Sequence, residues 1–342
     1  MTSADFQIIA EMEAAPEAVK RQEQLLPAML KPLAARLQQR PPIVAVTCAR
    51  GSSAHAAAFG KHLIERYLGI PVAAAAPNIV SIYGQRLRLP GQLFIAISQS
   101  GMSTDLIEQA AAARASGAVT ACITNDAESE LARQCEFILP MAAGPELSVP
   151  ATKTFVASLS ALARLVSLWA GNEALSRALQ RLPDRLAAAS KLDWSYLPER
   201  IGGADSLVTV GRGPTLAIAR EAALKLKEMT VLHAEAFSSA EFLHGPVSLV
   251  SPGYPVLIFT PTDAAAASVR QLTTDLRAKG AALFTTDWDD DPDCLPTLPP
   301  DHPETDPICL IQSFYIMAVR LASVRGTDAG QPRHLRKITR TR

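Results

Sequence analysis

The sequence contains an internal repeat, which constrains the fold more than any other feature. Three segments of the first half recur in the second half at an offset of 162 to 163 residues. The paired segments are residues 44–51 with 207–213, 92–98 with 254–260, and 113–126 with 276–287. One such match could arise by chance, but three at nearly one offset indicate a duplicated domain.

Within each copy, short apolar runs alternate with helical stretches. In the first copy the expected strands are residues 43–49, 71–76, 93–98 and 118–125, with a fifth candidate at 137–144. Strands that alternate with helices of about 10–15 residues are typical of parallel sheets built from βαβ units. We therefore predict an α/β fold with parallel, doubly wound sheets.

The ends of the chain differ from these copies. Residues 3–38 have helical apolar spacing, with Pro16 and Pro27 as breaks or first-turn positions. The last dozen residues are basic. The expected parts are an N-terminal helical arm (1–39), two domains (40–178 and 195–328) and a C-terminal tail (329–342).

Three further segments have their own patterns. A long helix is expected at about 153–170, and a linker helix at about 172–195. The segment 287–307 is acidic and rich in proline, so we expect a surface excursion with short strand content at best.

The composition argues against several classes of protein. The 33 Lys and Arg residues balance 33 Asp and Glu residues, which is not typical of a nucleic-acid binder. Five widely spaced cysteines predict reduced thiols and a cytoplasmic protein. We expect no membrane span, because no signal pattern occurs and no apolar run approaches about 18–20 residues. No histidine or cysteine cluster has ligand spacing, so we expect no metal.

A serine-rich turn follows the third expected strand. Residues 98–103 read SQSGMS and precede an expected helix. Ligands of open α/β sheets bind beyond the carboxyl ends of the strands, and helix N-termini attract anions. The hydroxyl groups that would suit a phosphate are those of Ser98, Ser100 and Ser103, with Ser52 and Ser53 as a second wall. The alternative is that Ser103 only caps the helix and the others are turn residues.

The ligand expected at this turn is a phosphorylated small molecule. Neither a phosphate-binding loop of the nucleoside-triphosphatase type nor a complete dinucleotide glycine pattern occurs in the sequence.

A second cluster of polar residues lies in an expected buried helix within residues 220–237. Glu221, Lys225 and Glu228 fall on one face of that helix. A solvated ladder of ion pairs is the ordinary interpretation, but the stretch is rich in Ala, Leu and Met. His244 follows in a turn before Gly-Pro, and a carboxylate with a histidine forms an acid–base set. The alternative for His244 is a core histidine satisfied by backbone groups.

These motifs together resemble the sugar isomerase (SIS) family, in particular the double-SIS isomerase half of glucosamine-6-phosphate synthases. The matching segments are SQSGMSTD (98–105), ELSVPATKTF (146–155), EAALKLKEMTVLHAEAF (221–237), EFLHGPVSL (241–249) and QPRHLRK (331–337). The resemblance implies two tandem SIS domains, each a flavodoxin-like three-layer sandwich, and no cofactor.

The resemblance also implies roles for individual residues. The sugar phosphate would be held by Ser98, Gln99, Ser100 and Ser103, with Ser52 and Ser53 nearby. Glu228 would move a proton between C1 and C2 of the open-chain sugar. His244 would open the ring from the neighbouring subunit of a homodimer with a shared active site. Lys337 would close over the substrate, with Lys225 and Glu221 as supporting residues. Val149 would contact the sugar through its backbone.

Departures from the synthase pattern refine the expected activity. Residue 2 is threonine where the synthase has its cysteine nucleophile, and the arm is short, so we expect no glutaminase activity. Ala151 replaces a serine, and the first loop reads ARGSS (49–53). Such loops resemble stand-alone glucosamine-6-phosphate deaminases of the second type. We therefore expect conversion of glucosamine 6-phosphate to fructose 6-phosphate and ammonia. Aldose–ketose isomerase, fructosamine-phosphate deglycase and sugar-phosphate sensor are the alternatives.

Overall fold

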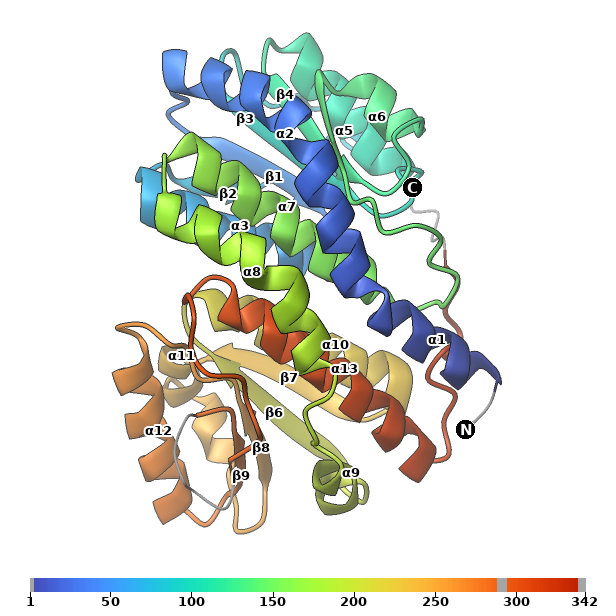
Figure 1. Ribbon diagram of the computed structural model, residues 1–342, viewed down its shortest axis with the longest axis vertical. Coiled ribbons are helices and arrows are strands. Elements are labelled where there is room, and N and C mark those ends of the chain that lie inside the picture. The colour runs from blue at the N-terminus through green and yellow to red at the C-terminus, as the bar shows by residue number, and fades with distance from the viewer. Residues whose placement is uncertain (1–2, 288–293, 338–342) are drawn as a thin grey trace. The chain divides into compact units, whose positions relative to one another are not determined.

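The computed structural model describes residues 3–287 and 294–337 (Figure 1). The chain divides into two compact units. The first-sheet unit comprises Ala14–Glu146, Lys153–Pro183 and Arg336–Arg342, and the second-sheet unit comprises Met1–Glu13, Leu147–Thr152 and Asp184–Leu335. The expected N-terminal arm is therefore shared, because α1 (Ser3–Glu13) falls in the second-sheet unit and α2 (Ala15–Gln39) in the first-sheet unit.

The first-sheet unit contains a five-stranded parallel sheet in the order β2-β1-β3-β4-β5. Its strands are β1 (Ala45–Ala49), β2 (Val72–Ala74), β3 (Leu93–Ser98), β4 (Val119–Thr124) and β5 (Phe137–Pro140). This is the flavodoxin-like strand order of a doubly wound sheet, as predicted.

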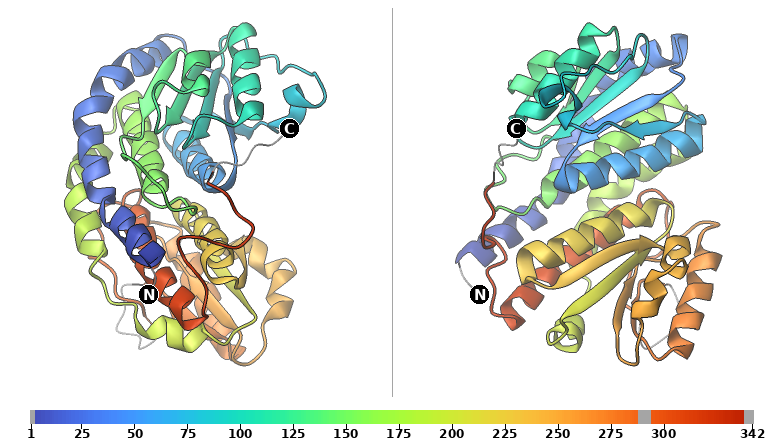
Figure 2. Two further views of the ribbon diagram at one scale, coloured as in Figure 1. Left: turned by 90° about the vertical axis from the view of Figure 1, so that its right-hand side faces the viewer. Right: turned by 180° about the vertical axis from the view of Figure 1, so that it is seen from behind.

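Helices cover both faces of this sheet (Figure 2, left). The helices of the unit are α2, α3 (Gly51–Leu68), α4 (Asn78–Ser81), α5 (Thr104–Ala115), α6 (Glu130–Gln134), α7 (Lys153–Trp169) and the first part of α8 (Glu173–Ala189). On the face of α5 and α6, Phe94 and Cys122 pack against Leu106 and Leu131 in one core cluster. Helices α2 and α3 both pack against α7, whose residues are nearly all buried.

The second-sheet unit repeats the arrangement with four parallel strands in the order β7-β6-β8-β9. The strands are β6 (Ser206–Gly211), β7 (His233–Ser238), β8 (Pro255–Ile258) and β9 (Ala282–Thr285). The helices are α1, the end of α8, α9 (Tyr196–Ile201), α10 (Pro214–Thr230), α11 (Ser239–Leu243), α12 (Ala266–Ala278), α13 (Asp306–Val324) and the 3-10 helix η1 (Pro246–Leu249). A parallel bridge between Thr285, at the end of β9, and Cys294 corresponds to the pairing of β4 with β5 in the first sheet.

The strand registers confirm the duplication. Val46 pairs with Phe94 between β1 and β3, and Val208 pairs with Val256 between β6 and β8. Both partners of the second pair lie 162 positions after those of the first. The internal repeat of the sequence is therefore a structural repeat of the sheet.

Two expectations about local structure were wrong, and a third was wrong in part. Pro27 does not break the N-terminal helix but lies inside α2. The apolar face of α2 packs against α7 and β5, and this burial outweighs the hydrogen bond lost at proline. The expected helix over 220–237 ends at Thr230, because Val231 takes a left-handed conformation, and β7 follows. Residues 288–293 of the segment 287–307 lie outside the described residues. In the rest of the segment, the bridge at Cys294 confirms the expected short strand content, but Leu295 is buried, so this part is not wholly a surface excursion.

Helix α13 was not predicted at all. Within the part of the chain that the structure describes, it is the one helix that is long and apolar enough to cross a membrane. However, 72% of its apolar window is buried inside the protein, as in the core helix of a soluble domain. It packs against α1, α9 and α10 in the second-sheet unit.

Candidate functional site

The serine-rich turn lies at the carboxyl end of β3. The hydroxyl oxygen of Ser98 accepts the backbone N–H of Gly101 (3.2 Å), and that of Ser100 accepts the N–H of Met102 (3.3 Å). The backbone carbonyl of Gln99 accepts the N–H of Asn125 (3.1 Å), which ties the turn to the end of β4. The turn is therefore held in one shape by its own side chains and by the neighbouring strand.

Ser103 precedes α5 in the N-cap position, but its side chain forms no capping hydrogen bond. The interpretation of Ser103 as a simple cap is therefore wrong, whereas Ser98 and Ser100 do bond within the turn, as that alternative expected of turn residues. Its backbone is extended and its side chain is half-buried. In the first turn of α5 the Asp105 carboxylate accepts the N–H of Leu106 (2.9 Å), and the Ser103 hydroxyl group is not used as a cap. A hydroxyl group at the N-terminus of a helix suits the binding of an anion there.

The second expected wall lies in the adjacent loop of the same sheet. Ser52 and Ser53 begin α3 directly after β1, and both are half-buried. Because β1 pairs with β3, the loops that follow these two strands leave the same edge of the sheet side by side. The structure therefore brings Ser52 and Ser53 to the edge that carries residues 98–103.

Lys337 of the C-terminal tail also belongs to the first-sheet unit. Its ammonium group lies 3.0 Å from the carboxylate of Glu146, which is buried. Glu146 also accepts the backbone N–H (3.1 Å) and the hydroxyl group (2.7 Å) of Thr154. Glu146 was not predicted as a site residue, although it opens the ELSVPATKTF segment. An acidic residue in that segment was the available signal.

In the second-sheet unit, α10 carries the predicted row of charged residues. Lys225 is fully buried, and its ammonium group pairs with Glu228 and with Glu221 (3.4 Å). Glu221 is buried and accepts the hydroxyl group of Tyr315 from α13 (3.4 Å). The side chain of Glu228 is 21% exposed, so the row ends in one accessible carboxylate. The interpretation of this row as a solvated ladder of ion pairs is therefore wrong. Tyr315 also belongs to the row, although the sequence did not predict it.

The two carboxylates determine the charge of Lys225. Burial alone lowers the pKa of this lysine, but attraction by Glu221 and Glu228, with their hydrogen bonds, outweighs it, so the pKa is raised. Lys225 therefore stays protonated near neutral pH and holds a positive charge beside the Glu228 carboxylate.

His244 is exposed at the end of α11, so it is not a core histidine. Its backbone N–H donates to the carbonyl of Glu241 (3.0 Å), and Ser238 caps the start of this short helix. The imidazole ring thus projects from a fixed turn at the surface of the unit. This position allows contact with a substrate or a second subunit.

Helix α1 holds two further segments of the second-sheet unit. The carboxylate of Glu11 accepts the backbone N–H groups of Leu147 (2.6 Å) and Ser148 (3.2 Å). Asp5 accepts the N–H of Ala329 (3.3 Å). The N–H of Val149 donates to the carbonyl of Gly330 (3.1 Å). Because this N–H is already bonded, the carbonyl group of Val149 is the backbone group assigned to the expected contact with the sugar.

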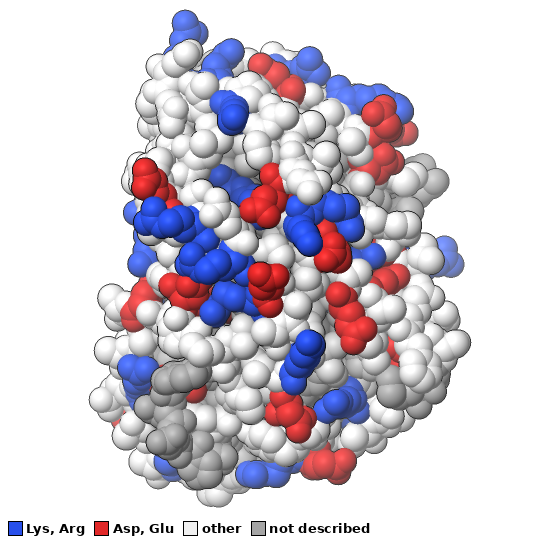
Figure 3. All heavy atoms as spheres, in the orientation of Figure 1, with Lys and Arg blue, Asp and Glu red and all other residues white. Residues whose placement is uncertain are grey.

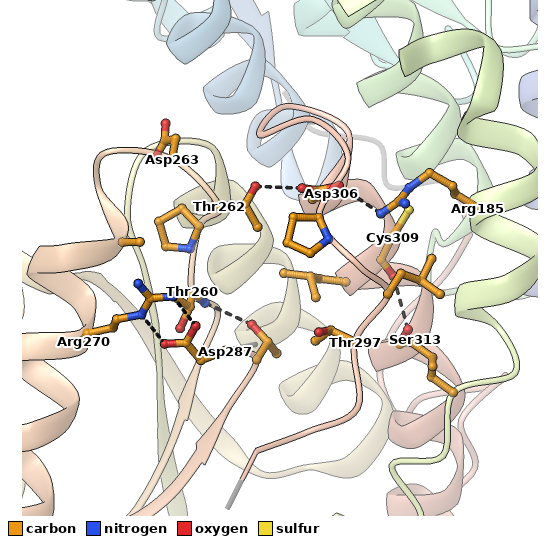
Figure 4. A pocket seen from close by; sticks show the side chains of 17 residues that line it. Arg185, Thr260, Thr262, Asp263, Arg270, Asp287, Thr297, Asp306, Cys309 and Ser313 are labelled. Carbon is orange, nitrogen blue, oxygen red and sulfur yellow. Dashed lines mark hydrogen bonds and ion pairs between the residues drawn. The ribbon is translucent and has the colours of Figure 1, made fainter. Parts of the chain in front are cut away.

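The second copy of the serine-rich turn has different chemistry. Residues 260–263 follow β8 and read Thr-Pro-Thr-Asp, and the Asp263 carboxylate accepts the N–H of Ala265 (3.0 Å) at the start of α12. A cavity of about 210 Å³ adjoins this turn (Figure 4). Its arginines are neutralised by carboxylates, in the pairs Arg270–Asp287 (2.6 Å) and Arg185–Asp306 (3.0 Å). This end of the second sheet is therefore not suited to an anion.

The predicted residues fall into two groups. The first-sheet unit carries Ser52, Ser53, Ser98, Gln99, Ser100, Ser103 and Lys337, and the second-sheet unit carries Val149, Glu221, Lys225, Glu228 and His244. The first group offers hydroxyl groups and helix N–H groups, which suit an anion. The second offers a carboxylate beside a buried cation, which suits proton transfer.

Charges of both signs are interspersed on the face of the molecule in Figure 3. Among the described residues, no group of three or more His, Cys, Asp or Glu side chains is arranged to hold a metal ion.

Comparisons with known proteins also find two related segments in this chain. The family model described as SIS domain matches residues 44–168 and 201–288. The glutamine–fructose-6-phosphate aminotransferase of Symbiobacterium thermophilum is 34% identical over 316 residues, which are 86% of this chain and 51% of that protein. The chain thus spans about half the length of the curated relatives it matches.

Solved structures extend the comparison over nearly the whole chain. A Silicibacter pomeroyi protein, provisionally described as a phosphosugar isomerase, is 44% identical with a TM-score of 0.90, covering 94% of this chain and 99% of its own. The C-terminal domain of the Francisella tularensis glucosamine-fructose-6-phosphate aminotransferase is 25% identical, with a TM-score of 0.84 and coverage of 95% and 98%. A glucosamine-6-phosphate deaminase from Thermotoga maritima shares the fold at 22% identity, with a TM-score of 0.73 and coverage of 96% and 100%.

Proposed function

Because this chain belongs to the SIS domain family, we propose that it isomerises and deaminates an amino sugar 6-phosphate. The proposed substrate is glucosamine 6-phosphate, and the products are fructose 6-phosphate and ammonia. The observation that carries the proposal is the row on α10, in which a buried, protonated Lys225 pairs with the partly exposed carboxylate of Glu228.

The phosphate group is assigned to the turn after β3. The N-terminus of α5 and the hydroxyl groups of Ser98, Ser100 and Ser103 offer donors for its oxygens. Gln99, Ser52 and Ser53 complete this half of the site.

The proton transfer is assigned to Glu228. In the open-chain aldose, its carboxylate removes the proton from C2, and the C1 carbonyl oxygen takes a proton from water to become the hydroxyl group of an enolamine. The same carboxyl group returns the first proton to C1, and the nitrogen gives one proton back to the hydroxide, which leaves an imine at C2. Water adds to this imine and ammonia departs, giving fructose 6-phosphate. The charge that develops on the substrate is stabilised by the cation of Lys225 or of Lys337.

The remaining predicted residues support these steps. His244 assists ring opening, and its exposure agrees with action on a substrate held by a second copy of the chain in a homodimer. Lys337 covers the substrate, with the Glu146 pair as its resting position. The Val149 carbonyl contacts the sugar, and Glu221 holds Lys225 in place.

A plain aldose–ketose phosphosugar isomerase is the second candidate. The relative at 44% identity is provisionally described as a phosphosugar isomerase. The same row of residues would serve this reaction, since proton transfer between C1 and C2 does not require nitrogen on the substrate.

An assay for ammonia separates the two candidates. The protein is incubated with glucosamine, galactosamine and glucose 6-phosphates, and ammonia and ketose phosphate are both measured. Ammonia released in step with fructose 6-phosphate from glucosamine 6-phosphate supports the proposal. Interconversion of glucose and fructose 6-phosphates without ammonia from any amino sugar phosphate would replace it with the plain isomerase. No reaction with any of the three would contradict both.

A further inference from the structure

We propose that Arg50 is a positioning residue for the substrate phosphate, which it serves by neutralising Asp105 at the start of α5. This inference rests on the proposed function, because it concerns the phosphate that the turn after β3 is assigned to hold. Arg50 lies in the loop after β1, which reads ARGSS (49–53).

The two residues form a close ion pair between neighbouring loops. The Nε atom of Arg50 lies 2.8 Å from Oδ2 of Asp105, and Nη2 bonds to the same oxygen. Asp105 is the second residue of α5 and its side chain is only 1% exposed. Arg50 ends the loop after β1, and its side chain is 45% exposed. The pair therefore joins the buried start of α5 to the loop that leads into Ser52 and Ser53.

The position of Asp105 creates an electrostatic problem for phosphate binding. A phosphate at the first turn of α5 would lie next to a carboxylate carried by that same turn. Like charges repel, and the repulsion is screened little when one of them is buried. Arg50 cancels the charge of Asp105 through this ion pair, while 45% of its own side chain stays exposed.

The second copy shows that this pair accompanies the serine-rich turn. Arg212 occupies the position that corresponds to Arg50, 162 residues later, but Ala267 occupies the position that corresponds to Asp105. In that copy the Asp263 carboxylate accepts an N–H at the start of α12, and the serine-rich turn is absent. The arginine–aspartate pair is thus found in the copy that carries the serine-rich turn.

The test measures binding of inorganic phosphate by calorimetry, and the kinetics with glucosamine 6-phosphate. In Arg50→Gln, we expect phosphate affinity to fall about 10- to 100-fold and KM to rise equally, with kcat within about twofold. Adding Asp105→Asn should restore most of the affinity, because the carboxylate that Arg50 neutralises is removed. The matched control is Arg177→Gln, which breaks the exposed pair with Glu173 on α8 of the same unit and should change neither quantity.

Two further variants keep the test decisive if Arg50→Gln does not fold. Arg50→Lys retains the charge and should keep phosphate affinity within a few-fold. Asp105→Asn alone should bind phosphate at least as tightly as the wild type. A tenfold loss in Asp105→Asn, wild-type affinity in Arg50→Gln, or no recovery in the double variant would each overturn the role of Arg50.

Failure of the proposed phosphate site is recognised separately. If Ser100→Ala/Ser103→Ala binds phosphate as the wild type does, the assignment of the turn itself is wrong. If that variant loses affinity and Arg50→Gln does not, the turn holds phosphate and only the role of Arg50 is refuted.

Discussion

A Cβ atom placed on Gly101 would lie 2.2 Å from the hydroxyl oxygen of Ser129 and 2.4 Å from its Cβ. Gly101 also has a φ of +62°, which side chains other than glycine's rarely adopt. Ser129 cannot retreat without loss, because its hydroxyl group accepts the N–H of Ala132 and caps α6. Close contact between the serine-rich turn and the start of α6 therefore fixes glycine at position 101.

The first prediction follows from this contact. Gly101→Ala should lower both the free energy of unfolding and the affinity for phosphate, because strain and the clash with Ser129 both distort the turn. Gly69→Ala is the matched control, since Gly69 has a similar φ of +67° but no atom within 4 Å of the added Cβ. It should cost only the left-handed strain of about 1–2 kcal/mol. Urea denaturation and phosphate titration measure both effects, and equal losses in the two variants would mean that the clash has no influence.

The second prediction concerns the proton-transfer group. Glu228→Gln should bind glucosamine 6-phosphate with nearly wild-type affinity but lose at least about 100-fold in kcat, because an amide does not accept the C2 proton. Ammonia release and calorimetric binding are the measurements. Glu199→Gln changes an exposed glutamate on α9 and serves as the control. Full turnover by Glu228→Gln would remove this residue from the mechanism.

The third prediction concerns the buried cation of the row. Lys225→Met leaves the buried carboxylate of Glu221 without its cation, so the free energy of unfolding should fall by about 3–5 kcal/mol. The double variant Lys225→Met/Glu221→Leu should recover part of that loss, because the buried carboxylate is removed together with the lysine. Urea denaturation followed by circular dichroism measures both. A loss below about 1 kcal/mol in Lys225→Met would show that the pairs contribute little to folding.

The fourth prediction concerns alkaline pH. Burial raises the pKa of the Cys48 and Cys309 thiols from 9.0 to about 12. The folded protein therefore keeps two protons that the unfolded chain releases above pH 9. The resulting stability is fully present below pH 9 and is lost as the pH rises towards 12, with a slope of at most about 1.4 kcal/mol per pH unit for each thiol. Denaturation at pH 8, 9 and 10 should show a shallower decline in Cys48→Ala/Cys309→Ala than in the wild type, and parallel curves would contradict the assignment.

Much of the fold was predictable because the repeat and the strand–helix alternation are local patterns of the sequence. Helix α13 escaped prediction for a physical reason: it is apolar on nearly every face, so it lacks the periodicity of a half-exposed helix. Strand β7 was missed because the Ala and Glu residues before Ser238 favour helix, whereas pairing with β6 imposes the strand.

The site residues also differ in whether a local sequence pattern could predict them. Ser98 and Ser100 are visible in the sequence because they directly follow an apolar strand. The partners of Lys337 and Arg50 are not, since Glu146 lies 191 positions from Lys337 and Asp105 lies 55 positions from Arg50. Contacts over such separations arise from the topology of the sheet and leave no local pattern. Tyr315 was hidden for the same reason, because it reaches Glu221 from an unpredicted helix.

The altered turn of the second copy has an evolutionary consequence. A fused gene with two versions of one module needs anion recognition from only one of them, so selection no longer preserves it in the other. Pro261 and Asp263 are the kind of substitutions that such freedom permits. An ancestor with a single module, in contrast, would have needed one sequence for both anion recognition and proton transfer. Each improvement of one of these two functions would have been limited by the other.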